Sequence, residues 1–382
     1  MRICWRMAAA LLIGGAAMPA AHADGLAAGD YRIGFVTENT GPIAFAGLSY
    51  YHGAQLAAEE ITASGRLGAG VKLTLADKES GSDPARAIQD MHQFIADRSI
   101  LATSCCILSA VAGSLKPIVL GAGMPLVIFG ATAPGLPKPP VVYSMTILPG
   151  PKDVATAQHA VEVMHPKTAA YFVSADNDAF KARMAAGQHA VEAAGVKTVG
   201  VVSVLSSDTD FTAPATQAIG YDPDTILVYT TQTPAEGIIA ALRARGYAKT
   251  IVGNDVLSPA TVFKKMGATV ADVPFPISFS AALAATPEAK AFVAAYTKKF
   301  DAPPDIYSAQ GYQVVQFIAQ GLHVLSGKPT RESLGAALAQ IKSVEPNVYG
   351  GEPMVDGQAE TKDTVIVAWT KDGAIAPWPS GK

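Results

Sequence analysis

Apolar and polar residues alternate in blocks along most of this chain. Short continuous apolar runs, which are typical of strands buried on both faces, recur between longer segments with helical spacing. The predicted strands include residues 31–38, 71–79 and 168–175, and the predicted helices include residues 49–64, 83–98 and 178–195. This alternation predicts an α/β fold in which helices cover parallel sheets on both faces.

The strand–helix pattern stops near residue 149 and then starts again. A chain of 382 residues also exceeds what one hydrophobic core usually serves, so we expect two doubly wound parallel-sheet lobes. The C-terminal third does not repeat the pattern, and we expect it to return first to lobe 1 and then to lobe 2. The predicted assignment is residues 24–147 and 279–348 in lobe 1, and residues 148–278 and 349–382 in lobe 2.

The first 23 residues have the pattern of a cleaved signal peptide. Arg2 and Arg6 precede a short apolar run, and Ala21-His22-Ala23 provides the small residues that signal peptidases prefer. The apolar run is shorter than a membrane span requires. We therefore expect export to the periplasm as a soluble protein.

Composition and motifs exclude several classes of function. The formal net charge is −3 and the chain has no basic run, so we expect no nucleic-acid partner. Phosphate-binding glycine loops, zinc-protease motifs and serine-hydrolase motifs are absent from the sequence, and its seven histidines are scattered. We expect a monomer that is not an enzyme and needs no cofactor or metal.

Two cysteines, Cys105 and Cys106, remain beyond the signal peptide. Neighbouring cysteines rarely form a relaxed disulfide, because the bond needs a larger Cα separation than one peptide unit allows. We expect two small buried side chains near the end of a strand.

Hydroxyl residues stand at the ends of two predicted strands within residues 99–134. The first strand leads to Ser109 at the start of a helix, and the second ends just before Thr132. Parallel strands bring such ends to one edge of a sheet. A helix start adds unpaired N–H groups and partial positive charge. This unit predicts a site for an anion such as a carboxylate, without a nucleophile–base pair or a metal.

Several segments, in this order and spacing, resemble the leucine/isoleucine/valine-binding proteins, the type I periplasmic solute-binding family of ABC importers. They include IGFVTENTGPIAFAGLSYYHGAQLAAEEI, PLVIFGATAPGL and IVGND. The resemblance covers nearly the whole chain after residue 23. It implies two lobes joined by three crossover strands, a ligand held in the cleft between them, closure of the lobes around it, and a membrane permease as partner.

The resemblance also implies roles for individual residues. The ligand's α-carboxylate would be held by Ser109, Ala131 and Thr132. Its ammonium group would meet Asp255, where the family more often has glutamate. Phe180 and Tyr307 would supply aromatic contacts. Capping roles for Ser109 and Asp255, and core packing for the two aromatic residues, remain open at this point.

Two positions depart from the family pattern. Thr231 stands where the branched-chain amino acid binders have a tyrosine in the second lobe. Ala46 stands where they have an aromatic residue in the first, with Phe45 beside it. Both changes reshape the pocket for the ligand's side chain.

The first functional hypothesis is therefore a binding protein for an apolar amino acid. The alternative on the same fold is an aromatic or other organic acid without an amine, and a hydrolase or ligand-sensing protein is the third hypothesis. Asp255 discriminates the first two hypotheses, because a side-chain carboxylate without a counter-charge in the cleft favours a ligand with an amine. An Asp255 turned away from the cleft would favour the organic acid.

Overall fold

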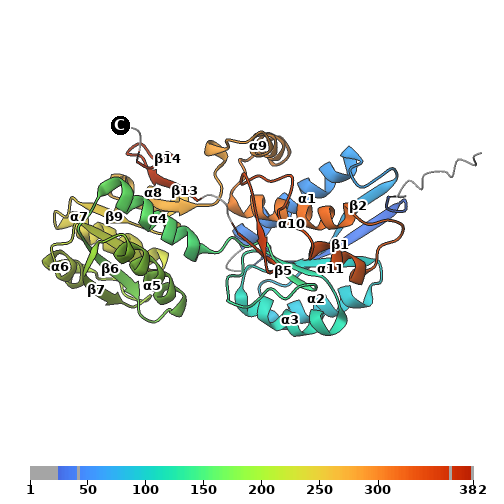
Figure 1. Ribbon diagram of the computed structural model, residues 1–382, viewed down its shortest axis with the longest axis horizontal. Coiled ribbons are helices and arrows are strands. Elements are labelled where there is room, and N and C mark those ends of the chain that lie inside the picture. Colours follow the sequence, from blue (N-terminus) through green and yellow to red (C-terminus); the bar gives the residue numbers. More distant parts are fainter. Residues whose placement is uncertain (1–24, 41–43, 361–363, 380–382) are drawn as a thin grey trace, which may run out of the picture.

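Two parallel sheets, each at the centre of its own lobe, organise the chain (Figure 1). This computed structural model describes residues 25–40, 44–360 and 364–379, so the predicted signal peptide lies outside the described residues. The predicted fold class of two doubly wound lobes is confirmed.

The sheet of lobe 1 has seven strands in the order β11-β12-β5-β4-β3-β1-β2. All neighbours pair in parallel except β11 and β12, which form an antiparallel hairpin at the edge. The strands are β1 (Gly29–Thr37), β2 (Val71–Glu79), β3 (Ile100–Cys105), β4 (Leu126–Ile128), β5 (Val142–Ser144), β11 (Met354–Val355) and β12 (Gln358–Ala359).

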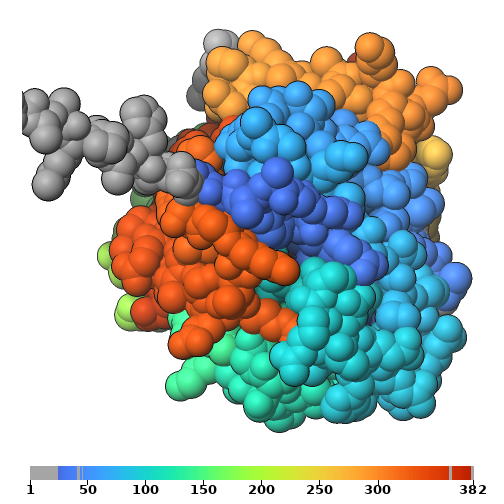
Figure 2. All heavy atoms as spheres, turned by 90° about the vertical axis from the view of Figure 1, so that its right-hand side faces the viewer, coloured from blue at the N-terminus to red at the C-terminus, as the bar shows by residue number. Residues whose placement is uncertain are grey.

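Helices cover both faces of this sheet because the side chains of its strands alternate between two cores. Ile33 and Phe35 of β1 belong to the core under α1 and α10, whereas Val36 belongs to the core under α2 and α3. The helices of this lobe are α1 (Ala44–Ser64), α2 (Pro84–Ala96), α3 (Ser109–Ala122), α9 (Pro287–Phe300), α10 (Ile306–His323) and α11 (Arg331–Leu338). Segments from the N-terminal third and from the region around residue 300 share its outer surface (Figure 2).

Helices α1 and α10 cross at two glycines. A Cβ atom on Gly53 would lie 1.9 Å from the carbonyl oxygen of Ser308, and one on Gly311 would lie 1.9 Å from that of Tyr50. Only glycine allows this approach of the two backbones. The crossing fixes the positions from which Tyr50 and Tyr307 extend.

The sheet of lobe 2 has four parallel strands in the order β7-β6-β8-β9. Alternate residues of β6 again face two cores, one containing Phe172 and the other Tyr171. The strands are β6 (Thr168–Ser174), β7 (Lys197–Val204), β8 (Thr225–Tyr229) and β9 (Thr250–Val252). The helices are α4 (Pro149–Met164), α5 (Asp178–Ala193), α6 (Thr212–Gly220), α7 (Gln232–Ala244) and α8 (Ala260–Met266), with 3-10 turns η1 (Asp255–Leu257) and η2 (Gly267–Val270).

A third, antiparallel sheet of order β10-β13-β14 packs on lobe 2. Its strands are β10 (Phe275–Ile277), β13 (Val365–Trp369) and β14 (Ile375–Pro377), and the 3-10 turn η3 (Ala281–Leu283) follows β10. The sheets to which the strands belong show that the chain passes from one lobe to the other after β5, after β10 and between β12 and β13. The resemblance implied three such crossovers.

The sequence assigned all of residues 349–382 to lobe 2, and the structure corrects this boundary. Gln358 of β12 pairs with Ser144 of β5, so β11 and β12 extend the sheet of lobe 1. Only β13 and β14 join lobe 2. Strands β11 and β12 have two residues each, which is too short to give a periodic sequence pattern, and this explains the misplaced boundary.

The structure also joins Cys105 to Cys106 by a disulfide, which corrects the expectation of two unlinked side chains. Their Cα atoms are 3.3 Å apart, closer than across a trans peptide. Both residues are fully buried at the end of β3, as predicted.

Candidate functional site

A cavity of about 800 Å³ lies between the two lobes, and we refer to it as the cleft. Lobe 1, the crossover segments and lobe 2 all contribute to its lining. The lining includes Tyr50, Gly130, Thr132, Asp305, Tyr307 and Gln310 from lobe 1, Thr146, Ile147, Ile277 and Phe279 from the crossovers, and Lys152, Asp255, Pro259, Trp369 and Ile375 from the lobe 2 side. Three predicted site residues, Thr132, Asp255 and Tyr307, therefore meet in one cavity.

The loop after β4 presents Thr132 to the cleft. The Ser109 hydroxyl accepts hydrogen bonds from the backbone N–H groups of Thr132, at 3.2 Å, and Ala133, at 3.1 Å. Ser109 is the first residue of α3 rather than its cap, and this bond ties the helix start to the loop. Thr132 itself is exposed and lines the cleft.

Ser109 and Ala131 are not among the residues that line the cavity, and their direct contact with the ligand stays a prediction. Ala131 is buried, and its N–H donates to the carbonyl oxygen of Cys106 at 3.1 Å. Both residues have local partners, so in this structure they position the loop. Thr132 is the one of the three that faces the cleft.

Aromatic rings form the lobe 1 wall beside this loop. The ring of Tyr50 lies 4.3 Å from that of Phe129 and 5.5 Å from that of Tyr307. Its hydroxyl donates to Oε1 of Gln310. Burial raises the pKa of Tyr50 well above its ordinary value, so the hydroxyl stays protonated.

Tyr50 was missed as a lining residue because its segment has an ordinary helical pattern. In the sequence, Gly130 was the one residue that could have indicated a side chain packed closely against this loop. Its φ is +84°, and a Cβ atom there would lie 3.0 Å from the Tyr50 hydroxyl.

On the lobe 2 side, Asp255 belongs to a network of four charged groups. Its Oδ1 atom lies 2.6 Å from Nη2 of Arg183, and the same guanidinium binds Asp153. Asp255 is 32 % exposed, whereas the Asp153 side chain is 1 % exposed. The fourth group is Lys152, whose ammonium donates to the hydroxyl of Ser278 at 3.0 Å.

The charges in this network balance. Burial raises the pKa of Asp255, but the positive charges of Arg183 and Lys152 outweigh it and hold that pKa below its ordinary value. Burial raises the pKa of Asp153 to about 6, against the effect of Arg183. At neutral pH, two cations face two anions, so Asp255 lines the cleft with its charge already compensated.

Three other predicted contacts do not reach the cavity. The side chain of Asn177 accepts the N–H groups of Ala179 and Phe180, and this cap directs Phe180 into the core, where the Arg183 guanidinium lies 4.7 Å from its ring. Thr231 precedes α7 as its N-cap residue. Ala46 is buried in α1, and the side chain of Phe45 lies outside the described residues.

Several polar residues of the cleft were not predicted, among them Asp305, Thr146 and Lys152. Asp305 caps α10, accepting the N–H of Ser308 at 2.8 Å and the hydroxyl of Ser49 at 2.9 Å. Thr146 and Lys152 lie on either side of the first crossover. None of them stands in a motif, although Pro149 and Pro151 around the start of α4 mark a change of direction.

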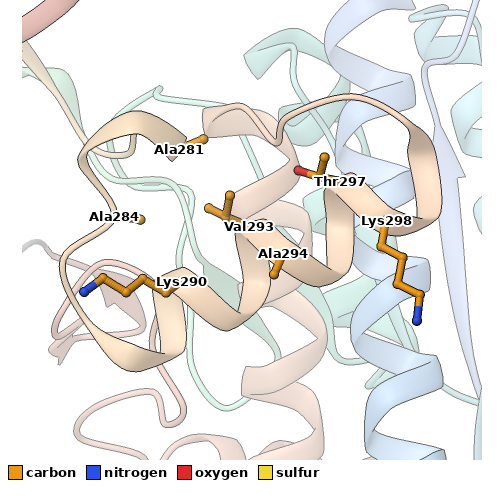
Figure 3. A pocket seen from close by; sticks show the side chains of 7 residues that line it. All are labelled: Ala281, Ala284, Lys290, Val293, Ala294, Thr297 and Lys298. Atoms are coloured by element: carbon orange, nitrogen blue, oxygen red, sulfur yellow. The ribbon is translucent and has the colours of Figure 1, made fainter.

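A second hollow, of about 530 Å³, lies outside the cleft between η3 and α9 (Figure 3). Alanines, Val293, Thr297 and the exposed Lys290 and Lys298 line it. Nowhere in residues 25–40, 44–360 and 364–379 do three or more metal-ligating side chains gather into a candidate metal site. Within these same ranges, every helix is too short or too polar to span a membrane.

Comparisons with known proteins agree with this architecture. The family model described as periplasmic binding protein matches residues 30–374. The Leu/Ile/Val-binding protein BraC3 of Rhizobium johnstonii is 27% identical over 344 residues, which cover 87% of this chain and 88% of that protein.

Two solved structures share the fold. LivJ of Streptococcus pneumoniae, a branched-chain amino acid transporter substrate-binding protein solved with isoleucine, has a TM-score of 0.73 and 24% identity over 91% of this chain and 98% of its own. A solute-binding protein of R. palustris solved with 4-hydroxybenzoate has a TM-score of 0.73 and 17% identity, over 91% and 95% respectively. This chain belongs to the type I periplasmic binding protein family.

Proposed function

We propose that this protein is the extracytoplasmic solute-binding component of an ABC importer and that it binds a small carboxylic acid with an apolar body. The observation that carries the proposal is Thr132, which stands on a strand-end loop in a cavity with mainly apolar lining. A threonine hydroxyl can donate a hydrogen bond to a carboxylate oxygen of such an acid.

The two-lobed arrangement and the family support the proposed import role. Binding to both walls would draw the lobes together, and the closed form would deliver the ligand to a membrane permease. We propose that the protein works as a monomer in the periplasm after removal of residues 1–23 and releases its ligand chemically unchanged.

An organic acid without an amine fits the lobe 2 wall better than an amino acid. Asp255 faces the cleft, as the amino-acid hypothesis requires, but Arg183 already compensates its charge. A ligand ammonium placed there would add a charge to a balanced network. One relative is named for 4-hydroxybenzoate, which is an acid of this kind.

Amino acids are the second candidate, and Asp305 favours them. Its carboxylate lines the cleft, and no lysine, arginine or histidine pairs with it among the residues the structure describes. An ammonium beside Asp305 would gain a charge-assisted hydrogen bond. Two relatives are named for leucine, isoleucine or valine, or were solved with isoleucine.

Two measurements on the mature protein test the proposal. Mass spectrometry identifies any ligand that the purified protein releases on denaturation, and we expect a carboxylic acid. A thermal-shift panel of amino acids, aromatic acids and aliphatic acids then ranks the classes, because a ligand specific to the native state raises the melting temperature. Stabilisation by sugars or polyamines alone would refute the proposal.

A further inference from the structure

We propose that the cleft contains a second subsite, formed by Lys152 and Thr146, which takes an oxygen acceptor at the far end of the ligand. This inference rests on the proposed function and specifies its substrate class. The ligand would be an acid with two oxygen-bearing ends, one at Thr132 and one at the first crossover.

Lys152 carries donors that its surroundings do not use. The residue is 3 % exposed, yet it lines the cleft. An ammonium group has three donors, and Ser278 is the one acceptor that bonds to it within the described part of the chain. Since unpaired donors of a buried cation are costly, a ligand oxygen at this point would satisfy them.

Thr146 provides an independent observation on the other side of the crossover. It is 3 % exposed and lines the cleft, and its hydroxyl has no hydrogen-bond partner among the described residues. Its backbone carbonyl, by contrast, accepts a hydrogen bond from Gln358. A buried hydroxyl without a partner beside a cavity is the arrangement expected where a ligand completes the bonding.

The start of α4 adds a weaker attraction for the same group. This helix has 16 residues, its N-cap Leu148 makes no side-chain cap, and Pro149 lines the cleft. The first turn therefore directs its partial positive charge towards the crossover. The two prolines remove N–H donors, so Gly150 and Lys152 supply the backbone N–H groups available there.

Charge balance defines which groups this subsite accepts. Asp153 and Asp255 attract Lys152, and Arg183 repels it, so the cation keeps its place within a neutral network. An incoming hydroxyl, carbonyl or carboxylate oxygen accepts from Lys152 without displacing an ion pair. An incoming ammonium would meet Lys152 as a like charge.

Calorimetric titration of the mature protein with matched acids tests this subsite. One set is benzoate, 4-hydroxybenzoate and terephthalate, and the other is hexanoate, 6-hydroxyhexanoate and adipate. We expect the two-ended acids of at least one set to bind more tightly than the one-ended acid. Lys152→Met should weaken two-ended acids about 10- to 100-fold, and Thr146→Val should weaken them about 3- to 10-fold. Because the one-ended acid would occupy only the Thr132 end of the cleft, neither variant should change its affinity by more than about threefold.

Lys290→Met is the matched control, because Lys290 is exposed on α9 outside the cleft (Figure 3). It should leave all affinities unchanged. Equal loss of one-ended and two-ended acids in Lys152→Met and Thr146→Val would overturn the subsite while the proposed function stands. If Lys152→Met does not fold, Thr146→Val alone decides. Failure of the wild-type protein to bind any acid or amino acid would overturn the proposed function and the subsite together.

Discussion

The two walls of the cleft that would bind the same ligand are held in place by different interactions. The lobe 1 wall combines aromatic rings and uncharged donors with the carboxylate of Asp305, and hydrogen bonds hold Tyr50 and the loop of Thr132 in place. The lobe 2 wall rests on a network of charged groups around Arg183. The comparison teaches that the first wall is fixed by close backbone packing, whereas the second depends on every charge having its partner.

The largest expected effect concerns the lobe 1 wall and its helix crossing. Gly311→Ala would place a methyl group 1.9 Å from a backbone oxygen of α1, so the two helices would have to separate. We expect a loss of more than about 3 kcal/mol in the free energy of unfolding, measured by chemical denaturation.

Gly113→Ala is the control for that substitution. Gly113 is exposed within α3, and no atom lies within 4 Å of its added Cβ. Alanine there should stabilise the protein by about 0.5–1 kcal/mol. A similar loss in both variants would show that the close crossing has no special role.

The next effect concerns the lobe 2 wall. Arg183→Met would leave the buried Asp153 and the half-buried Asp255 without their common cation. We expect a loss of about 3 kcal/mol at pH 7, because breaking a buried pair leaves an uncompensated charge. Without Arg183 the pKa of Asp153 should lie above its value of about 6 in the wild-type protein, so the loss should shrink as the pH falls from 7 to 6.

Lys249→Met is the matched control on the surface of the same lobe. Lys249 pairs with Asp222 at 3.0 Å, and the two side chains are 44 % and 93 % exposed. Its loss should change the free energy of unfolding by less than about 1 kcal/mol. Equal effects of the Arg183 and Lys249 substitutions would contradict the dependence of the lobe 2 wall on its buried charge network.

A smaller expected effect is a pH dependence of the free energy of unfolding that comes mainly from a buried carboxyl group in lobe 1. Burial raises the pKa of Glu352 in lobe 1 to about 8, although the amides of Gln313 and Asn347 donate to it. A raised carboxyl pKa stabilises the native state fully below the unfolded value near 4.5, and this stability is lost as the pH rises towards 8.

Glu352→Gln removes this titration. The free energy of unfolding of the wild-type protein should fall between pH 5 and pH 8 more steeply than that of the variant, with Asp153 as a second, smaller source of slope in both. Denaturation curves across that range measure it. Identical slopes would contradict the burial of an uncompensated carboxyl group in lobe 1.

The lobe 1 wall was more predictable from sequence than the lobe 2 wall. Thr132 follows a buried strand, and parallel strands bring their ends to one edge of a sheet, so its place follows from local pattern. Tyr307 came from the resemblance and also lines the cleft. Phe180 and Thr231 came from the resemblance too, but a local cap directs one into the core and the other starts α7.

The remaining features depend on contacts between distant residues, which no local pattern encodes. Arg183 neutralises Asp255 from 72 positions away, and β12 joins a strand more than 200 residues earlier. The disulfide between Cys105 and Cys106 was also missed, because general geometry disfavours it.

The central claim is that the cleft recognises a carboxylate through Thr132. The most direct measurement is calorimetric titration of the wild-type protein and Thr132→Ala with an acid from the panel and with its methyl ester. We predict that the acid binds, that the ester binds at least about tenfold more weakly, and that Thr132→Ala removes most of this difference. Equal binding of acid and ester, or an undiminished preference for the acid in Thr132→Ala, would contradict the claim.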